Sequence, residues 1–537
     1  MTTAAREKAG VPIRRFNSVV LPLPRKPVTR VTGRRASLMT GPIVTTGGCR
    51  AKRPGRMRQR CAMANSALDA RMRAPIAGGR MAERKGWWRP EAPWPEPVAK
   101  GKLVAINGKA LIDGNGGPVV KNPVIVLEGR RIKAVGVKGK LAPPRGAEVI
   151  DASRYTLMPG MMDCHVHTGM FNCMTFHNHR VAQWEVMPHL QQMYALFHAQ
   201  NCLDMGFTTL RDLGMNSSRG LFTQELCAVR DSINAGIVEG PRMLIGGFTT
   251  ITGSHLDLIQ PRAMPRSGFN NGDGPWELRK LARLNILWGC DIVKTCTSGG
   301  GGTDKEEPDI RNMCQEELDA IVDEAHAFHK PCAVHCFTVS GQRMALKAGA
   351  DTIEHMVFSD DETIEMIREA GVPVTPTLAH RTDHAIELRR QLGTSPFVLN
   401  KLKKLQPHCY NTFQKMYKGG VKIAMGTDMG FEPHFGDNGW ELEVYVGLGM
   451  TPMHAIQTAT RNAAEALRLD HDLGTVEAGK LADIVAVDGD PLADIRVIQE
   501  KKNIVLVMKE GRVCVDRRPG KSKNVVQVSD WPKIDNL

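Results

Sequence analysis

Through residues 159–470, short apolar runs rich in β-branched residues alternate with stretches that have the spacing of amphipathic helices. Helices are predicted over 315–329 and 360–370, and another begins at Thr451-Pro452, where an N-cap residue precedes proline at the first helical position. Alternation over about 310 residues predicts an α/β fold, either a (β/α)8 barrel or a doubly wound sheet. No Gly-x-Gly-x-x-Gly motif opens the first unit, which argues against a dinucleotide-binding sheet. Strands are expected at 207–210, 291–294, 332–335, 351–355, 372–375 and 421–425.

Both flanks of this region have the pattern of short, alternating strands. In each flank a Glu-Gly-Arg turn joins two apolar runs, which predicts a β-hairpin with glycine at the turn. A further strand precedes the second hairpin at 483–487. The runs and their turns are 124–127, 128–130 and 132–135 in the first flank, and 504–508, 510–512 and 513–515 in the second.

The two strand-rich flanks are expected to pair in space. We therefore predict a small composite β-sandwich domain made of residues 99–158 and 471–537, with a TIM-like (β/α)8 barrel of residues 159–470 inserted between its parts. Residues 1–98 are predicted to be a disordered basic tail and linker.

The net charge of +15 is concentrated in that tail. Residues 1–80 contain 18 Lys or Arg and two acidic residues, a local charge of +16, which leaves −1 for the rest of the chain. A segment without periodicity cannot bury enough apolar surface to offset its ordering entropy. Three interpretations stay open: an extension upstream of a true start at Met63 or Met81, an Arg-rich transit peptide, or an arm that binds polyanions. Nucleic acid is not an expected partner of the nearly neutral body.

The cysteine pattern and the hydropathy indicate the cellular compartment in which we expect the protein. The chain has 13 cysteines, no Cys-x-x-Cys pair and no secretory signal pattern, which argues against a disulfide scaffold and indicates a reducing, cytoplasmic environment. No run approaches the roughly 18 consecutive apolar residues of a membrane span. We expect no membrane association.

Candidate chemistry begins with the string Asp163-Cys-His165-Val-His167. Residues i and i+2 of an extended strand face the same side, so the two imidazoles point in one direction, with Asp163 on that face too. A His-x-His pair can chelate a metal ion, but alone it is also common as two polar residues at a strand end. The neighbouring Cys164 faces the other way and is expected to pack in the core, as are Cys296 and Cys336.

Four more polar residues follow at the ends of later predicted strands. A lysine buried at a strand end has a lowered pKa, and its neutral amine can take up carbon dioxide as a carbamate, an anionic ligand that can bridge two cations. Taken alone, each of these residues is explained as readily by a structural role as by a functional one. If the strands form a barrel, all of them meet at its carboxyl end, where active sites of that fold lie. The four residues are Lys294, His335, His355 and Asp428.

The order His-x-His, Lys, His, His, Asp resembles the metal-dependent amidohydrolase superfamily. The flanking Pro159-Gly-Met-Met-Asp163 and Gly426-Thr-Asp428 match as well, and the resemblance covers about residues 100–520. The phrases Ile251-Thr-Gly-Ser-His255 and Val334-His-Cys-Phe337 are similar to the imidazolonepropionase/Xaa-Pro dipeptidase-like branch.

This resemblance implies two divalent metal ions. One ion would be bound by His165 and His167 together with Asp428, and Lys294, as its carbamate, would bridge to a second ion. Imidazole-rich ligation suits zinc best, with cobalt, nickel, iron or manganese as alternatives. The ligands of the second ion would be His335 and His355.

The resemblance also implies a mechanism and a substrate class. A hydroxide on the binuclear metal centre would attack an amide-type C–N bond of a peptide, an N-acyl amino acid, a cyclic amide or a carbamate. Asp428 would act first as general base and then as general acid. His255, on the loop after the third barrel strand, would hydrogen-bond the carbonyl oxygen or a substrate carboxylate.

Two alternatives stay open. A deaminase of the same superfamily usually has one metal and lacks the lysine ligand, so Lys294 favours the hydrolase. A non-catalytic relative would have lost metal ligands, whereas all six positions are filled here. The expected partners are a small-molecule or peptide substrate and, because the superfamily often forms them, further copies in a homo-oligomer.

Overall fold

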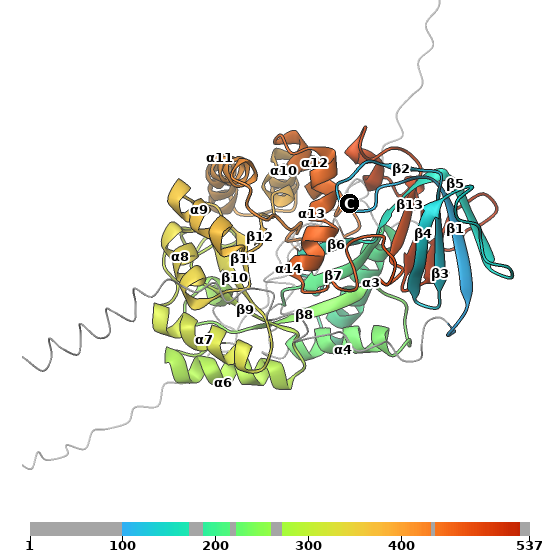
Figure 1. Cartoon of the computed structure of the whole chain (residues 1–537). Helices are drawn as coiled ribbons and strands as arrows, with labels where there is room; N and C mark the ends of the chain where they lie inside the picture. The colour runs from blue at the N-terminus through green and yellow to red at the C-terminus, as the bar shows by residue number, and fades with distance from the viewer. Residues whose placement is uncertain (1–98, 171–185, 215–221, 259–270, 431–434, 527–537) are drawn as a thin grey trace, which may run out of the picture. The chain divides into compact units, whose positions relative to one another are not determined.

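Seven parallel strands form the central sheet of the computed structural model, which describes residues 99–170, 186–214, 222–258, 271–430 and 435–526. The strands follow one another in chain order, each paired in parallel with the next (Figure 1). Nearly all of their residues are buried, as is typical of parallel sheets covered by helices. The strands are β6 (Met161–Val166), β7 (Phe207–Asp212), β8 (Arg242–Phe248), β9 (Ile292–Cys296), β10 (Cys332–Cys336), β11 (Thr352–His355) and β12 (Val374–Thr375).

Residues 421–429 join the two outer strands of this sheet. An isolated parallel bridge connects Val374 of β12 with Ile423, and another connects Val166 of β6 with Met429. The segment therefore occupies the position of an eighth barrel strand and brings its residues to the same end of the sheet as the strands beside it.

The closing segment differs from its prediction in one respect. A regular strand was expected at 421–425, and the structure has a single isolated bridge there instead, at Ile423. The backbone leaves the extended conformation soon afterwards, since Asp428 has a φ of 57°. The segment lies at the predicted position in the barrel, but it does not form the regular strand ladder that was predicted.

Helices cover the outside of the barrel strands (Figure 1). The helix predicted over 315–329 is α7 (Gln315–Ala327), and that predicted over 360–370 is α9 (Asp361–Ala370). The N-cap predicted at Thr451 is confirmed, because its side chain accepts a hydrogen bond from the backbone N–H of His454. The remaining helices are α3 (Pro188–Asp204), α4 (Phe222–Asn234), α5 (His255–Leu258), α6 (Gly274–Leu287), α8 (Val339–Ala348), η2 (Ala379–Arg381), α10 (Asp383–Gln391), α11 (Pro396–Lys418), α12 (Trp440–Gly447), α13 (Pro452–Thr458), α14 (Arg461–Ala466), η3 (Ile495–Gln499) and η4 (Lys501–Asn503).

The two flanks contribute to one eight-stranded sheet. β5 pairs in parallel with β1 of its own flank and antiparallel with β13 of the other, with Met158 opposite Val485. Both predicted hairpins are confirmed as the antiparallel pairs β3–β4 and β14–β15. The strands are β1 (Leu103–Leu111), β2 (Val120–Lys121), β3 (Pro123–Glu128), β4 (Arg131–Val137), β5 (Glu148–Pro159), β13 (Ile484–Val487), β14 (Ile504–Lys509) and β15 (Arg512–Asp516).

The turns of the two hairpins lie against each other. Gly511 has a φ of 76°, and a side chain there would meet the carbonyl oxygen of Gly129 at 2.5 Å. Residues from distant strands of the sheet, such as Ile132 of β4 and Leu506 of β14, share one hydrophobic cluster. The two-layer sandwich and the domain boundaries stay predictions, while the pairing of both flanks is observed.

A buried ion network connects this sheet to the barrel. The guanidinium of Arg242, at the start of β8, lies 3.0 Å from Asp483 and 2.6 Å from Glu510. Arg130 pairs with the same Glu510 carboxylate. Because each charge is paired, burial does not leave an isolated ion, and the contacts fix the approach of the sheet to the amino end of β8.

Two sequence predictions concern the ends of the chain and the membrane. The predicted basic tail lies outside the described residues. Within the described ranges, none of the helices combines the length and the apolar composition that crossing a membrane requires.

Candidate functional site

The six polar residues singled out from the sequence lie on the barrel strands, at their ends, or on the closing segment. His165 is in β6, His167 follows it, and Lys294, His335 and His355 are in β9, β10 and β11. The ring centroids of His165 and His355 are 4.8 Å apart, and those of His335 and His355 are 4.6 Å apart. The structure therefore brings these imidazoles together as the barrel prediction required.

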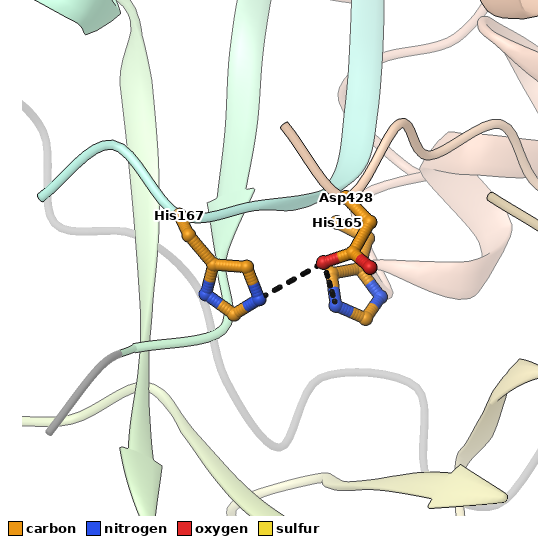
Figure 2. A group of neighbouring side chains, drawn as sticks. All are labelled: His165, His167 and Asp428. Atoms are coloured by element: carbon orange, nitrogen blue, oxygen red, sulfur yellow. Dashed lines mark ion pairs between the residues drawn. The ribbon is translucent and has the colours of Figure 1, made fainter. Parts of the chain in front are cut away.

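Asp428 lies between the two imidazoles of the His-x-His pair (Figure 2). Its Oδ1 atom is 3.5 Å from Nε2 of His165 and 3.2 Å from Nε2 of His167. The three potential ligand atoms all lie within 4.8 Å of one another. Two imidazole nitrogens and one carboxylate oxygen are a donor set that suits zinc and similar divalent ions.

Hydrogen bonds at the other ring nitrogens fix the orientation of these imidazoles. Nδ1–H of His165 donates to Glu354 at 2.9 Å, and Nδ1–H of His167 donates to the carbonyl oxygen of Gly214 at 2.6 Å. Both rings therefore present Nε2 toward Asp428. Such outer partners commonly fix the tautomer of a metal-binding histidine.

The carboxylate that orients His165 is itself held by a buried arginine. Arg211, on β7, donates to Glu354 at 2.7 Å and to Thr352 at 2.8 Å, and it also donates to the carbonyl oxygen of Cys164. Burial opposes ionisation of Glu354, but the Arg211 guanidinium and the His165 ring hold the pKa of this carboxyl well below its usual value. The inside of the barrel thus contains a paired charge directly beneath the imidazole cluster.

Burial keeps three of the imidazoles neutral, whereas at His167 the neighbouring Asp428 outweighs burial and raises the pKa. Burial lowers the pKa of His165 to about 4, with the Lys294 charge as the next cause, and it places those of His335 and His355 well below the usual value. A neutral imidazole has the free lone pair that a metal ion requires. The rings of His165, His335 and His355 can therefore bind a cation near neutral pH without first losing a proton.

Lys294 lies inside the barrel with only 2% of its surface exposed. Its Nζ has no hydrogen-bond partner among the described residues. Burial lowers the pKa of this amine to about 8. An unsatisfied amine next to an imidazole cluster is costly to the apoprotein, and it fits a group that becomes an anionic metal ligand.

Strained backbone is concentrated at the same end of the barrel. His355, Met356, Thr377 and Asp428 all have positive φ values, between 50° and 76°. Non-glycine residues in this region cost free energy and occur most often at functional sites.

Gly426 permits the close approach of the closing segment to β6. A Cβ atom there would lie 2.8 Å from Cβ of His165 and would also collide with the methyl group of Thr375. The residue two positions before Asp428 must therefore be glycine for the Asp428 carboxylate to reach the histidines.

His255 lies at the start of α5, on the loop after the third barrel strand, as predicted. Its ring stacks on that of His335 with centroids 4.2 Å apart and planes 21° apart. The His335 ring also stacks on Phe337, with the centroids 4.7 Å apart. His255 therefore borders the imidazole cluster.

Sequence reasoning missed several residues of the site. Besides Arg211 and Glu354, these include His380 of η2, whose Nε2 is 3.5 Å from Oδ2 of Asp428. Arg211 comes directly after the strand predicted at 207–210, and a charged residue in that position is the signal that could have marked it. His380 follows a strand of only two residues, β12, and had no motif to mark it.

Other candidates lie away from the cluster. Asp163 is buried but accepts hydrogen bonds from Thr427 and Asn438, so it ties β6 to the closing segment instead of joining the imidazoles. Cys164, Cys296 and Cys336 are buried within hydrophobic clusters, as predicted.

Several known proteins are similar to this chain in sequence or in fold. A sequence model of the amidohydrolase family matches residues 156–514. Ochratoxinase from Aspergillus niger is 29% identical over 435 residues, covering 77% of this chain and 86% of that protein. Imidazolonepropionase from Pseudomonas entomophila is 25% identical over 409 residues, covering 68% and 88%. The crystal structure of a Xaa-Pro dipeptidase with methionine bound in the active site superimposes with a TM-score of 0.70 at 33% identity, covering 77% and 99%.

Proposed function

The chain belongs to the amidohydrolase family and is a hydrolytic enzyme that acts on carbon–nitrogen bonds, and from this premise we propose that it cleaves an amide-type bond with two divalent metal ions. The observation that carries the proposal is the grouping of His165, His167 and Asp428 at the carboxyl end of the barrel, with the rings of His355 and His335 beside them. Zinc is the metal that we propose, since imidazole nitrogens dominate the donor set.

The ligands divide into two groups. His165, His167 and Asp428 would hold one ion, and His335 and His355 would hold the second. Lys294, as its carbamate, would bridge the two. The proposal is supported by the burial of the Lys294 amine and by its lack of a hydrogen-bond partner within the described ranges. The carbamate and the aspartate would supply two negative charges against four positive ones.

Bound metal ions would lower the pKa of a coordinated water and polarise the scissile carbonyl. Asp428 would take a proton from the attacking water and deliver it to the leaving nitrogen, because an amide anion departs poorly. Its two oxygens lie against His167 on one side and His380 on the other, which holds the carboxylate in one orientation. His255 would hydrogen-bond the carbonyl oxygen or a carboxylate of the substrate.

The proposed substrate is a peptide, an N-acyl amino acid, a cyclic amide or a carbamate. The names of the relatives support amide-type bonds, since they include a Xaa-Pro dipeptidase and an imidazolonepropionase. Lys294 favours this class over the deaminases, most of which lack a lysine ligand.

Metal analysis combined with a substrate panel tests the proposal. Protein produced with zinc and bicarbonate is expected to hold about two ions per chain by plasma mass spectrometry. It should hydrolyse at least one of an alanyl-proline dipeptide, an N-acetyl amino acid and a phenyl carbamate, and a chelator should abolish turnover. Protein with two ions that cleaves none of these, or turnover that survives complete metal removal, would contradict the proposal.

Two variants separate the site from the rest of the protein. Lys294→Ala is expected to lose the second ion and most turnover. His454→Ala, which changes an exposed histidine that hydrogen-bonds Tyr417, is the matched control and should retain both. A Lys294→Ala protein with two ions and near-normal turnover would refute the bridging role.

Three further features are part of the proposal. A two-layer sandwich is supported by the contact between the hairpin turns and by their shared hydrophobic cluster. A cytoplasmic location is supported by the ten cysteines in the described part of the chain, none of which forms a disulfide there. A homo-oligomer is proposed from the family resemblance alone.

A further inference from the structure

Glu306 is a buried carboxylate on the loop after the Lys294 strand, and it contacts a residue of the neighbouring loop. Its side chain is fully inaccessible to solvent. Oε1 and Oε2 lie 2.9 and 2.8 Å from Nδ1 of His255, and Oε2 also accepts the backbone N–H of Gly300 at 2.9 Å. A carboxylate in this place can only accept, so Nδ1 of His255 is the donor.

The His255 ring is confined on both sides. One face stacks on His335 at 4.2 Å, and a Cβ atom on Gly300 would collide with the ring. Its backbone N–H donates to Asn312 at 2.9 Å. Among the described residues, Nε2 of His255 has no hydrogen-bond partner, so the second ring nitrogen is left for a ligand.

The loop that carries Glu306 is anchored from outside. Lys401 of α11 donates through Nζ to the carbonyl oxygen of Thr303 at 2.8 Å and to that of Glu306 itself. The position of the Glu306 carboxylate is therefore set by the backbone of the loop and by a helix. Other contacts thus hold both partners, Glu306 and His255, in place.

We propose that Glu306 is a positioning residue that fixes the tautomer and ring orientation of His255, so that Nε2 is the atom that meets the substrate carbonyl or carboxylate. This inference rests on the proposed function, because it gives His255 the substrate contact assigned there. Glu306 contacts no substrate atom. It acts by keeping the other ring nitrogen occupied, as outer-sphere carboxylates do for metal-binding histidines.

Replacement of Glu306 by glutamine is the most specific test of this positioning role. The glutamine has the same shape, but its N–H group can donate to Nδ1 and so admits the opposite tautomer. In the metal-loaded enzyme we expect kcat to fall by about 10- to 100-fold with little change in KM. Metal content should stay unchanged. Glu307→Gln, which changes the exposed neighbouring carboxylate, is the matched control and should keep the wild-type kcat.

A double-mutant cycle distinguishes positioning from a structural role. In a His255→Ala background, Glu306→Gln should cause no further loss of kcat, since the residue through which it acts is absent. An equal loss in both backgrounds would overturn the proposal, as would a Glu306→Gln enzyme with wild-type kcat.

The imidazole nitrogen spectrum tests the same proposal without turnover. Protein labelled with 15N at histidine is expected to show His255, assigned by its absence in His255→Ala, with a protonated Nδ1. At the same pH, Glu306→Gln should raise the population with Nε2 protonated and Nδ1 bare. An unchanged His255 signal would refute the positioning role. If wild-type protein hydrolyses none of the panel, the proposed function fails, while this spectrum still decides the role of Glu306.

Discussion

Replacing Lys294 with methionine should stabilise the metal-free protein, although it removes a proposed metal ligand. The amine lies inside the barrel, is 2% exposed and has no hydrogen-bond partner within the described residues. Methionine has a similar length and no charge. The substitution therefore removes a desolvated charge and keeps most of the packing.

The size of the effect follows from the pKa of the amine. Burial lowers this pKa from 10.5 to about 8. Since each pKa unit corresponds to about 1.36 kcal/mol, the charged amine costs the folded apoprotein about 3 kcal/mol at neutral pH. Metal-free Lys294→Met should gain a free energy of unfolding of that order. The gain is an example of a functional residue that lowers stability.

The stability difference between Lys294→Met and the wild type depends on pH. Below pH 8 both folded and unfolded chains carry the proton, so the full cost applies to the wild type. Between pH 8 and 10.5 the unfolded chain binds more protons than the folded one, so the stability of the wild type rises with pH. The advantage of Lys294→Met should therefore shrink over this interval and vanish above it.

Urea denaturation of chelator-treated protein in carbon dioxide-free buffer measures the difference, because carbamate formation would neutralise the amine. Lys509→Met is the matched control: this lysine is partly buried, and its Nζ donates to the carbonyl oxygen of Gly240 at 2.5 Å. Burial lowers the pKa of Lys509 as well, so the control should gain some stability, but less than Lys294→Met. A metal-free Lys294→Met protein that is less stable than wild type at neutral pH would refute the reasoning.

Three further predictions concern the same end of the barrel. Asp428→Asn should largely keep its metal and lose about 100-fold or more in kcat, because the amide cannot accept the proton; metal loss equal to the activity loss would contradict the assigned role. Glu354→Gln leaves a buried guanidinium unpaired, so metal affinity should fall by about 10- to 100-fold and stability by about 3 to 5 kcal/mol, as chelator competition and denaturation would show. Gly426→Ala places a methyl group 2.8 Å from Cβ of His165, so it should lower both melting temperature and kcat, whereas Gly447→Ala, with open space around it, should not. Normal melting of Gly426→Ala would show that the close approach is dispensable.

The positions of most proposed ligands can be predicted from the sequence. Side chains in a strand repeat every second residue, so His165 and His167 had to share a side, and parallel strands end at one edge of a barrel. Lys294, His335 and His355 needed only their strands to be recognised. The closing segment was harder, since Gly426 and the positive φ of Asp428 interrupt its ladder.

The side chains that orient these ligands could not be predicted in the same way. Arg211 and Glu354 are 143 residues apart in sequence, and His255 and Glu306 are 51 apart. Their contacts depend on how far loops and strands from different repeats approach one another, which local patterns do not specify. An arginine within a buried strand is the clearest local sign of such a partner.

The pairing of β5 with β13 has a consequence for synthesis on the ribosome. The residues of β5 are made before the barrel, and the strand that completes their ladder is made after it. Until that strand emerges, the buried residues Thr156–Pro159 at the end of β5 present an open edge while the whole barrel is being translated. Such long-range pairing forms slowly and late. The nascent chain is therefore most exposed to misassociation at this edge, and truncation before residue 484 would leave it permanently unpaired.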